Sequence, residues 1–397
     1  MKKTGTVSEM PSRSDLEEIE QAEAELKSKK RKKVLIILLV FVVLIFIAIA
    51  ALFILSRISY DSYEVTEILE DKDSGMNYIP FGDGYLRYSG SGIAKTAKTG
   101  SIEWNAGISM RTPIIITKDK YGAIYDRGGN SVTVFSESGI ETHISTALPI
   151  ISAELSEYGV SAVMTGEEGR SLINFYDRGG RELDIEIGNT DSVISGYPIN
   201  MTLSPSGTGL VLSYLFTEGT TIRSDIVFLN FDSGQSLADR EVGRFSYQDS
   251  IFPELHYLSE DRAVCFADNR IEFYSLKHEL SPEVINEYTF EAKVKSIAYS
   301  DKYIAMITSD AGGYRLSVFD SEGEFKFDKS FDFEYTNLKI SGRNVLIFGG
   351  EKTYIVSLFG VDKYLGTFDG NVSDMISLGI CRFLQVGDFG AREVTLR

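Results

Sequence analysis

The chain of 397 residues is poor in the residue types on which disulfide and metal scaffolds depend. It has two cysteines and three histidines, which excludes a disulfide framework and an array of zinc fingers. Its 40 basic residues are outnumbered by 57 acidic ones, and this disfavours nucleic acid as a partner, because phosphate neutralisation requires clustered lysine and arginine. With 43% hydrophobic and 12% aromatic residues, the chain can bury a large core, which excludes disorder as its main state.

One long apolar run interrupts this acidic sequence. Residues 34–55 are apolar throughout, and a helix of this length spans roughly 33 Å, enough to cross the hydrocarbon core of a bilayer. The five residues 29–33 are all basic, whereas Arg57 is the only cation close behind the run. This asymmetry predicts a single-pass protein of the cytoplasmic membrane, with a cytoplasmic N-terminus and an extracytoplasmic C-terminal domain.

A cleaved signal peptide is the alternative to an uncleaved signal-anchor. Ala48 and Ala50 have the small-x-small spacing of a cleavage site, but the sequence stays apolar through Leu55. Because a cleavage region should turn polar at this point, the signal-anchor is favoured.

The predicted organisation therefore has four parts. Residues 1–33 form a short cytoplasmic tail, 34–55 the transmembrane helix, 56–63 a linker, and 64–397 an extracytoplasmic domain. The residues after the tail carry 50 acidic and 31 basic side chains. This excess of negative charge disfavours broad adhesion to anionic polymers or lipid head groups.

The extracytoplasmic part consists of short runs rich in valine, isoleucine, tyrosine and phenylalanine, separated by turn residues. Its glycine content, 36 in the chain against eight prolines, suits tight hairpins. Several strands that end in an aromatic residue before a polar turn recur along the chain, with the aromatic at Phe135, Tyr176, Phe231, Phe273 and Phe319. A period of about 40–45 residues containing four short strands is typical of a β-propeller.

We divide this domain into eight units, which begin near Asn77, Thr112, Ile151, Pro198, Phe252, Lys293, Glu334 and Asn371. The last unit is short and supplies three strands. We expect residues 64–71 to supply its missing outer strand, which would close the ring and remove a free sheet edge. An extra stretch at 217–223 predicts a hairpin insertion. The fold class is thus all-β, a β-propeller with eight blades favoured and seven as the alternative.

The segment 93–104 resembles the tryptophan-docking motif of quinoprotein-like propellers, in which a tryptophan ties one blade to the next. Ala94, Thr99, Gly100 and Trp104 match the motif, while its aspartate is absent and no other unit has the tryptophan. The whole chain also resembles a group of uncharacterised bacterial proteins with one N-terminal anchor and a degenerate, WD40-like propeller. These resemblances imply a fold and bring no assigned activity.

The histidines and cysteines are interpreted as structural residues. His143, His256 and His278 are expected at surfaces or strand ends of three different blades, without a second histidine or cysteine at metal-ligand spacing. Cys265 and Cys381 are expected as buried, unpaired strand residues of the fifth and eighth blades, too far apart for a disulfide.

No other motif carries chemistry. The glycine-rich turns lack the ending of a phosphate-binding loop, and no nucleophile elbow is present. Residues 71–75 faintly resemble the start of a calcium loop, but Gly82 stands where the loop requires a glutamate. Close carboxylate pairs arise by chance in so acidic a domain. We therefore predict no catalytic, cofactor-binding or metal-binding residue, and no cofactor.

The sequence favours a non-catalytic binding scaffold, tethered to the membrane at the cell envelope, whose partner is another envelope protein or polymer. Two alternatives stay open. One is a sensor that relays a signal through a partner in the inner membrane. The other is a hydrolase or lyase that acts on envelope carbohydrate. A propeller fold by itself does not decide among them.

Overall fold

The computed structural model describes residues 33, 35–47, 57–70, 75–167, 170–189, 196–218, 221–232, 240–248, 250–278, 281–310 and 312–397. The chain divides into two compact units, Met1–Ile58 and Ser59–Arg397.

In the first unit, residues 35–47 are helical, and their large apolar side chains are exposed. Among the described residues, no helix is long and apolar enough to cross a membrane. Residues 34 and 48–55 of the predicted span, and residues 1–32 of the predicted tail, lie outside the described part of the chain.

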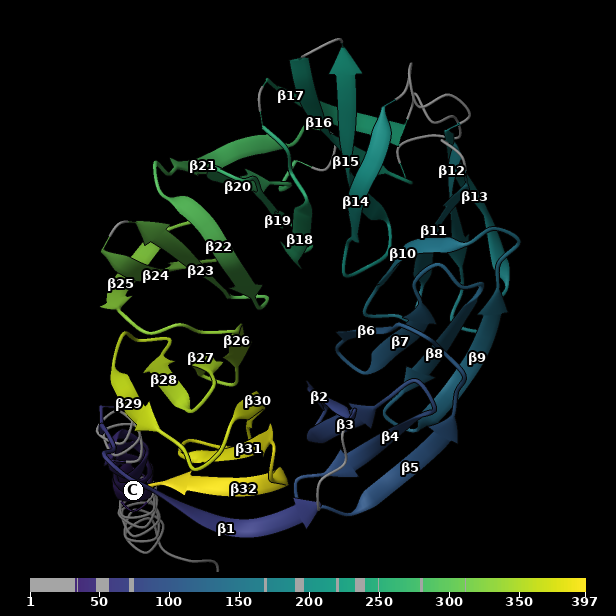
Figure 1. The fold of residues 1–397 in the computed structure, drawn as a ribbon. Helices are drawn as coiled ribbons and strands as arrows, with labels where there is room; N and C mark the ends of the chain where they lie inside the picture. The colour runs from purple at the N-terminus through teal and green to yellow at the C-terminus, as the bar shows by residue number, and fades with distance from the viewer. Residues whose placement is uncertain are drawn as a thin grey trace, which may run out of the picture. The chain divides into compact units, whose positions relative to one another are not determined.

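The second unit is a β-propeller of eight antiparallel four-stranded sheets, which Figure 1 shows arranged radially around a common centre. The strands are given from the innermost to the outermost. Blade 1 has β2 (Asn77–Phe81), β3 (Gly84–Tyr88), β4 (Gly92–Ala97) and β5 (Ile102–Gly107). Blade 2 has β6 (Pro113–Lys118), β7 (Tyr121–Asp126), β8 (Ser131–Ser136) and β9 (Gly139–Ser145). Blade 3 has β10 (Ile150–Leu155), β11 (Ser161–Glu167), β12 (Arg170–Tyr176) and β13 (Glu182–Asn189). Blade 4 has β14 (Tyr197–Leu203), β15 (Gly209–Glu218), β16 (Thr221–Asn230) and β17 (Glu241–Gln248).

The second half of the ring repeats this order. Blade 5 has β18 (Glu254–Ser259), β19 (Arg262–Phe266), β20 (Arg270–Ser275) and β21 (Glu283–Thr289). Blade 6 has β22 (Lys293–Tyr299), β23 (Tyr303–Asp310), β24 (Gly313–Asp320) and β25 (Phe325–Phe331). Blade 7 has β26 (Asn337–Ser341), β27 (Asn344–Gly349), β28 (Lys352–Ser357) and β29 (Asp362–Thr367). Blade 8 has β30 (Val372–Ser377), β31 (Arg382–Gly387), β32 (Gly390–Leu396) and, as its outer strand, β1 (Tyr63–Glu70).

The ring closes as the sequence predicts. Strand β1 pairs antiparallel with β32, with Tyr63 opposite Leu396. Blade 8 therefore contains the first and the last strand of the propeller. Eight blades are confirmed, and each begins within a few residues of its predicted position. The recurring aromatic residues lie in or directly after the third strand of consecutive blades. The predicted insertion is a longer hairpin in blade 4, where β15 and β16 pair over their whole lengths.

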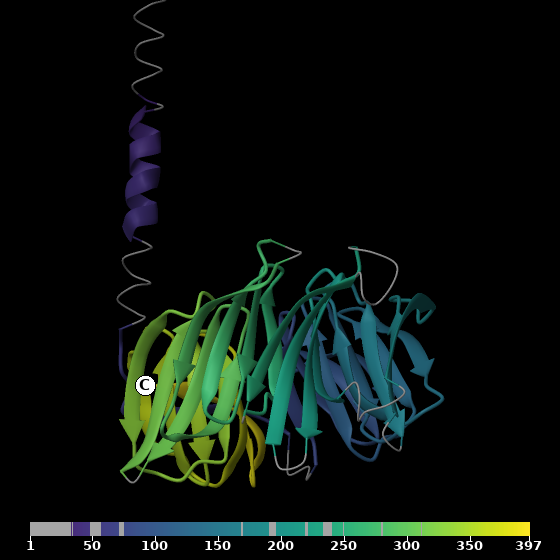
Figure 2. The same cartoon turned by 90° about the horizontal axis from the view of Figure 1, so that it is seen from above.

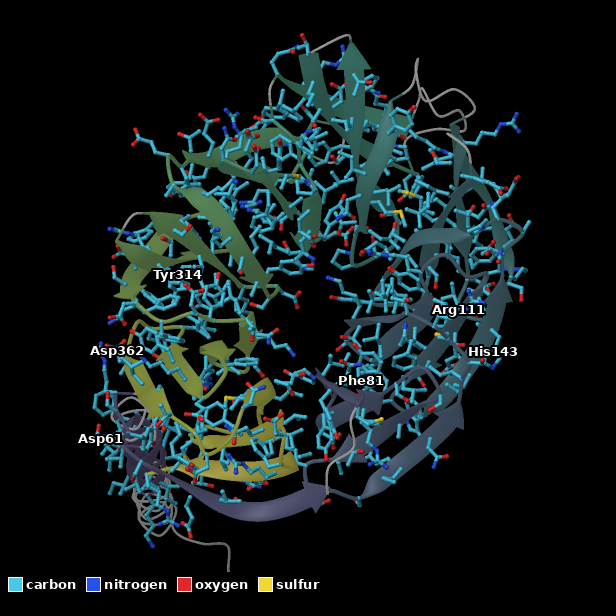
Figure 3. All side chains as sticks on the ribbon, viewed as in Figure 1. Asp61, Phe81, Arg111, His143, Tyr314 and Asp362 are labelled. Carbon is cyan, nitrogen blue, oxygen red and sulfur yellow. The ribbon has the colours of Figure 1, made fainter. Side chains whose placement is uncertain are left out.

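The apolar core lies between the blades. Eight clusters of buried side chains are present among the described residues, and each joins one pair of neighbouring blades. A single four-stranded sheet has two apolar faces and cannot cover either of them alone, so each blade depends on both neighbours. Figure 3 shows these side chains filling the spaces between the sheets.

Candidate functional site

The propeller has two faces that differ in the turns they carry. One face has the turns between the first and second strands and between the third and fourth strands of each blade. The chain enters the propeller at this face, because β1 begins beside the end of β32. Here Tyr60 donates its backbone N–H to the carbonyl of Lys363 at the start of β29, at 2.8 Å. We call it the N-terminal face; Figure 2 shows the disc edge-on.

The innermost strands of the eight blades surround the centre of the ring (Figure 1). Figure 3 shows a space between the side chains there, which we call the central channel. At the mouth of the channel on the N-terminal face lies a pocket of about 290 Å³. It is lined by turns of blades 2, 3 and 6 and by one strand of blade 5, through Thr117, Lys118, Asp119, Glu157, His256, Tyr299, Ser300 and Asp301. We call this pocket the channel mouth. It is polar, and it draws on blades from opposite sides of the ring.

Lys118 reaches across the channel mouth. It ends β6 in blade 2, and its ammonium group lies 3.9 Å from the carboxylate of Asp301 in blade 6. The Lys118 side chain is only 14% exposed, whereas that of Asp301 is 71% exposed. The ion pair therefore joins opposite blades, with its cation held inside the protein and its anion largely in water.

An aromatic pair forms the wall of the channel mouth between blades 5 and 6. The ring of His256, in the middle of β18, stacks on the ring of Tyr299 at the end of β22, with the ring centres 4.0 Å apart. The Tyr299 hydroxyl donates a hydrogen bond of 2.8 Å to Glu254, also on β18. Because Glu254 and His256 are two positions apart on one strand, both project to the same side of the sheet.

Three groups around the channel mouth have pKa values displaced chiefly by burial. Burial raises the pKa of Glu154, on β10, to about 8; Lys118 opposes this rise and Glu254 adds to it. Burial also raises the pKa of Glu254, against the hydrogen bond from Tyr299. The pKa of His256 is lowered well below its usual value, first by burial and then by the charge of Lys118. At neutral pH His256 is therefore neutral, and Glu154 holds its proton.

A second pocket, of about 570 Å³, continues along the inner strands of blades 5, 6 and 7. It shares Glu254 and Tyr299 with the wall of the channel mouth, and Lys339 on β26 lines its far side. Lys339 is paired with Asp374 of blade 8 at 2.5 Å. Tyr299 thus lines both the polar channel mouth and this second pocket, whose lining residues are mostly apolar.

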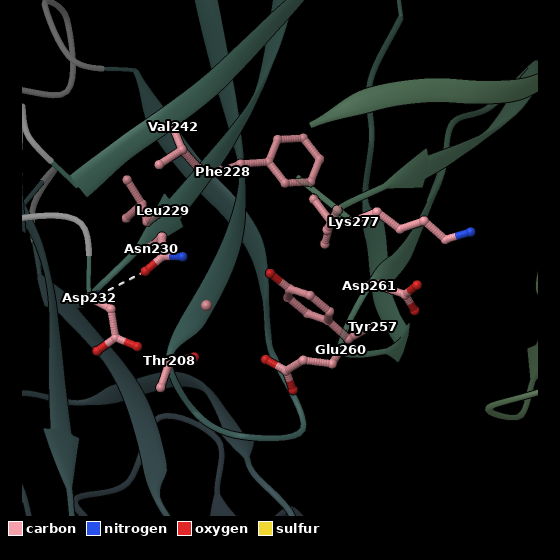
Figure 4. Close-up of a pocket in the computed structure, with 12 residues that line it drawn as sticks. Thr208, Phe228, Leu229, Asn230, Asp232, Val242, Tyr257, Glu260, Asp261 and Lys277 are labelled. Atoms are coloured by element: carbon pink, nitrogen blue, oxygen red, sulfur yellow. Dashed lines mark hydrogen bonds between the residues drawn. The ribbon is translucent and has the colours of Figure 1, made fainter. Parts of the chain in front are cut away.

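A third pocket lies between blades 4 and 5, away from the channel (Figure 4). It has a volume of about 250 Å³. Glu260 on its wall accepts hydrogen bonds from the backbone N–H and the hydroxyl of Ser206, at 2.9 and 2.6 Å. Asn230 accepts one from the backbone N–H of Asp232, at 2.8 Å (Figure 4). Glu260 is therefore part of a clamp between the two blades.

The predicted histidine positions need correction. His256 and His278 belong to the same blade, blade 5, and not to two different blades. His256 lies within an inner strand and lines the channel mouth, where its side chain is directed towards Tyr299 of blade 6. His143 lies on the outer strand of blade 2, where Figure 3 places it at the rim, and it forms a 3.0 Å hydrogen bond with Thr133. His278 lies in an exposed turn. The three are not brought together.

The two cysteines are both free. Cys265 is buried on β19, as predicted, but Cys381 is partly exposed in the turn before β31 and is not a strand residue. Among the described residues, no group of three or more histidine, cysteine, aspartate or glutamate side chains is placed to hold a metal ion. Most of the segment compared with a calcium loop, 71–74, lies outside the described residues.

The docking tryptophan is placed as the motif implies. Trp104, on the outer strand of blade 1, donates its indole N–H to the carbonyl of Glu137, in the β8–β9 turn of blade 2, at 3.0 Å. Thr142 makes the equivalent bond from blade 2 to Gly179 of blade 3, at 3.1 Å. Tyr288 of blade 5 bonds to Gly323 of blade 6, at 2.8 Å. A contact of this kind is therefore present at three interfaces of the ring, with a different side chain at each.

Sequence reasoning missed the residues that line the channel mouth. Four different blades supply Lys118, Glu154, Glu254 and Tyr299. No two of these residues are close together in the sequence, so no local motif contains them. The one available signal is that charged residues interrupt the innermost strands, which are otherwise mostly apolar.

Residues 56–396 match the model of a family of unknown function, DUF5711. The chain belongs to this family. No curated protein matches it.

Among solved structures, the Dos1 propeller superposes with a TM-score of 0.52 at 12% identity, over 86% of this chain and 95% of that one. BamB from Moraxella catarrhalis gives a TM-score of 0.46 at 12% identity, over 85% and 99%. The WD40 domain of Pan2 from Neurospora crassa gives 0.44 at 9% identity, over 72% and 88%. The likeness to the Dos1 propeller supports the fold alone. The resemblance to quinoprotein-like propellers stays a prediction.

Proposed function

We propose that the protein is a non-catalytic binding scaffold, tethered to the cytoplasmic membrane by residues 34–55 and displaying its propeller outside the membrane. The observation that carries this proposal is that the strand closing the ring, β1, is the first strand after the apolar run. A tether joined at the closure of a rigid ring holds a platform of fixed shape, and such platforms present loops and a channel to partners.

Two features of the first unit support the membrane tether. The described part of the run, 35–47, is helical with exposed apolar side chains, which water solvates poorly and a bilayer accepts. The basic residues 29–33 precede it, and this charge bias retains the N-terminus in the cytoplasm.

The orientation is tested by cysteine labelling in a full-length chain whose two native cysteines are replaced by serine. Asp83→Cys introduces a thiol at an exposed turn of blade 1, where the native side chain is 79% exposed, and Ser28→Cys introduces one in the tail. A maleimide that does not cross membranes should label Asp83→Cys, and not Ser28→Cys, on spheroplasts. Labelling of Ser28→Cys alone would reverse the topology, and labelling of neither before lysis would refute an external domain.

The scaffold role is tested by cross-linking the intact protein in its own membranes and purifying it in mild detergent. We expect envelope proteins to be captured with the full chain and not with a control truncated after Leu55. Equal capture by both would assign the interaction to the anchor. If nothing is captured and residues 57–397 instead cleave a wall polysaccharide, the protein is an enzyme and the scaffold proposal fails.

A further inference from the structure

The channel mouth holds an ammonium group among carboxylates. The Lys118 side chain, 14% exposed, extends from blade 2 to within 3.9 Å of Asp301 in blade 6. Its charge also acts on Glu154 and His256. Lys118 therefore occupies the centre of the mouth as a cation supplied by the protein itself.

The mouth carries more negative charge than this one cation neutralises. Asp119, Glu157 and Asp301 line it, and Lys118 is the one lysine or arginine among the described residues that do so. Glu154 and Glu254 stand beside these groups, but burial raises the pKa of both, and the protonated Glu154 adds no negative charge at neutral pH. Carboxylates around a recess with low-dielectric walls concentrate negative potential there, which attracts cations.

The wall formed by Tyr299 suits an organic cation. His256 stacks on Tyr299, and Phe266 lies nearly parallel to the same ring with the ring centres 6.2 Å apart. Tyr299 is 36% exposed and lines both channel pockets. The face of a tyrosine ring attracts an ammonium group electrostatically. A recess of about 290 Å³ is far larger than a bare metal ion and accommodates an ammonium group with its alkyl chain.

The backbone beside Lys118 is strained. Asp119, at the tip of the β6–β7 turn, has a φ of 47°, and it is the one non-glycine residue with positive φ among those described. Strain of this kind persists where the surrounding structure enforces it, and it is concentrated at functional sites. Asp119 follows Lys118 directly in the two-residue β6–β7 turn, a connection that favours a positive φ.

We propose that the channel mouth is a binding site for the primary ammonium group of a ligand, and that Lys118 is the built-in competitor which occupies the site when it is empty. The ligand class is an alkyl ammonium, supplied either by a free polyamine or by a lysine side chain of a partner protein. The site is independent of the membrane tether, so either proposal can fail without the other.

Removal of the competitor gives the sharpest test. Binding of spermidine and of N-acetyl-lysine methylamide to the full-length chain in detergent micelles is measured by isothermal titration calorimetry. Lys118→Met should raise the affinity about tenfold, because it removes both a competing and a repelling cation. Lys118→Arg keeps the charge and should bind as the native chain does. Lys277→Met, at an exposed position of blade 5 outside the mouth, makes the same change in net charge and should alter the affinity less than twofold.

Glu154 provides a second readout. It is protonated at neutral pH, and a bound cation stabilises its ionised form, so binding at pH 7 should release a proton. Titrations in phosphate and in MOPS, which differ in ionisation enthalpy and contain no primary amine, measure this release. Glu154→Gln in the Lys118→Met background should lose the proton release and weaken binding about tenfold. Melting curves of each variant check that it is folded.

The outcomes test the proposal and identify the source of the ammonium ligand. Tighter binding of the lysine derivative points to a protein partner, and tighter binding of spermidine points to a polyamine; either supports the site. If Lys118→Met binds neither compound at millimolar concentration, or if Lys277→Met raises the affinity equally, the proposal is wrong. In that case the ion pair of Lys118 with Asp301 only joins blades 2 and 6.

Discussion

The interface between blades 1 and 2 and the interface between blades 4 and 5 solve the same packing problem differently. The first has five buried apolar residues at its centre and eight partly buried ones packed against them, with Phe135 against Phe81 and Trp104. The second has ten, with Phe228 against Phe245 and Tyr274. Four partly buried apolar residues pack against this second centre. A closed ring therefore also accepts an interface whose apolar side chains are mostly partly buried, because closure holds each blade from both sides.

Each interface adds polar contacts suited to its packing. Blades 1 and 2 use the indole of Trp104, which is bonded to the backbone of the next blade. Blades 4 and 5 bury Glu272, which accepts hydrogen bonds from Tyr247 and Tyr274 and pairs with Arg270 at 3.1 Å. At the first interface, the directional hydrogen bond of Trp104 supplements a core with few fully buried side chains. At the second, the buried acid Glu272 requires a densely packed core that supplies all of its hydrogen-bond partners.

The largest expected effect is at the dense interface. Phe228→Ala should lower the free energy of unfolding by about 4–5 kcal/mol, and Phe135→Ala by about 3 kcal/mol, because a tightly packed site relaxes less around a cavity. Denaturant unfolding of both variants measures the difference. An equal or larger loss for Phe135→Ala would contradict the assignment of blades 1 and 2 as the looser interface.

The buried acid should matter next. Glu272→Ala removes the acceptor of Arg270 and of the Tyr247 and Tyr274 hydroxyls, although one hydroxyl can still donate to the other at 2.6 Å, and should destabilise the protein by about 3 kcal/mol. Glu272→Gln keeps an acceptor of similar shape and should lose clearly less stability. Thermal unfolding compares the two variants. If both variants lose the same amount of stability, the charge of Glu272 rather than its hydrogen bonding stabilises this interface.

The docking bond of blade 1 should have a smaller effect. Trp104→Phe removes the indole donor but keeps an aromatic ring, and should cost about 1 kcal/mol. The loss should appear in hydrogen exchange as faster opening of β5 and of the β8–β9 turn, while β19 and β20 stay protected. Thr142→Val, at the equivalent but exposed bond of blade 2, is the matched control and should have less effect. Uniformly faster exchange around the ring would mean that the bond acts globally.

A pH effect separates both interfaces from the channel. Burial raises the pKa of Glu154 from 4.5 to about 8, so the folded chain keeps a proton that the unfolded chain has already lost. Its contribution to stability is therefore present at pH 4.5 and below, and declines as pH rises towards 8. Melting temperatures of Glu154→Gln should fall less between pH 5 and pH 8 than those of the native chain. Parallel curves would show that Glu154 ionises normally.

Much of the fold was accessible from local sequence. The alternation of apolar and polar residues and the glycine turns mark each strand, so the blade starts at Asn77 and Lys293 were predicted to the residue. The closing strand was expected at 64–71 and occupies Tyr63–Glu70. Trp104 was identified because its motif lies within one short segment.

The errors fall where a position depends on distant parts of the chain. Cys381 was expected in a strand, but the turn before β31 includes it, since strand ends depend on pairing with β30. His256 was expected at a surface or strand end, and only the approach of Tyr299 from blade 6 makes its position part of a site.

The sequence by itself determined the repeating blade, the closing strand and the apolar run, because each depends on residues adjacent in the chain and on the two-residue period of a strand. The tertiary structure alone decided the channel mouth. Lys118 meets Asp301 only because eight blades of this size close into a ring that brings blades 2 and 6 face to face. Such contacts depend on the angles between all the blades of the ring together. These angles cannot be predicted from any one segment of the sequence.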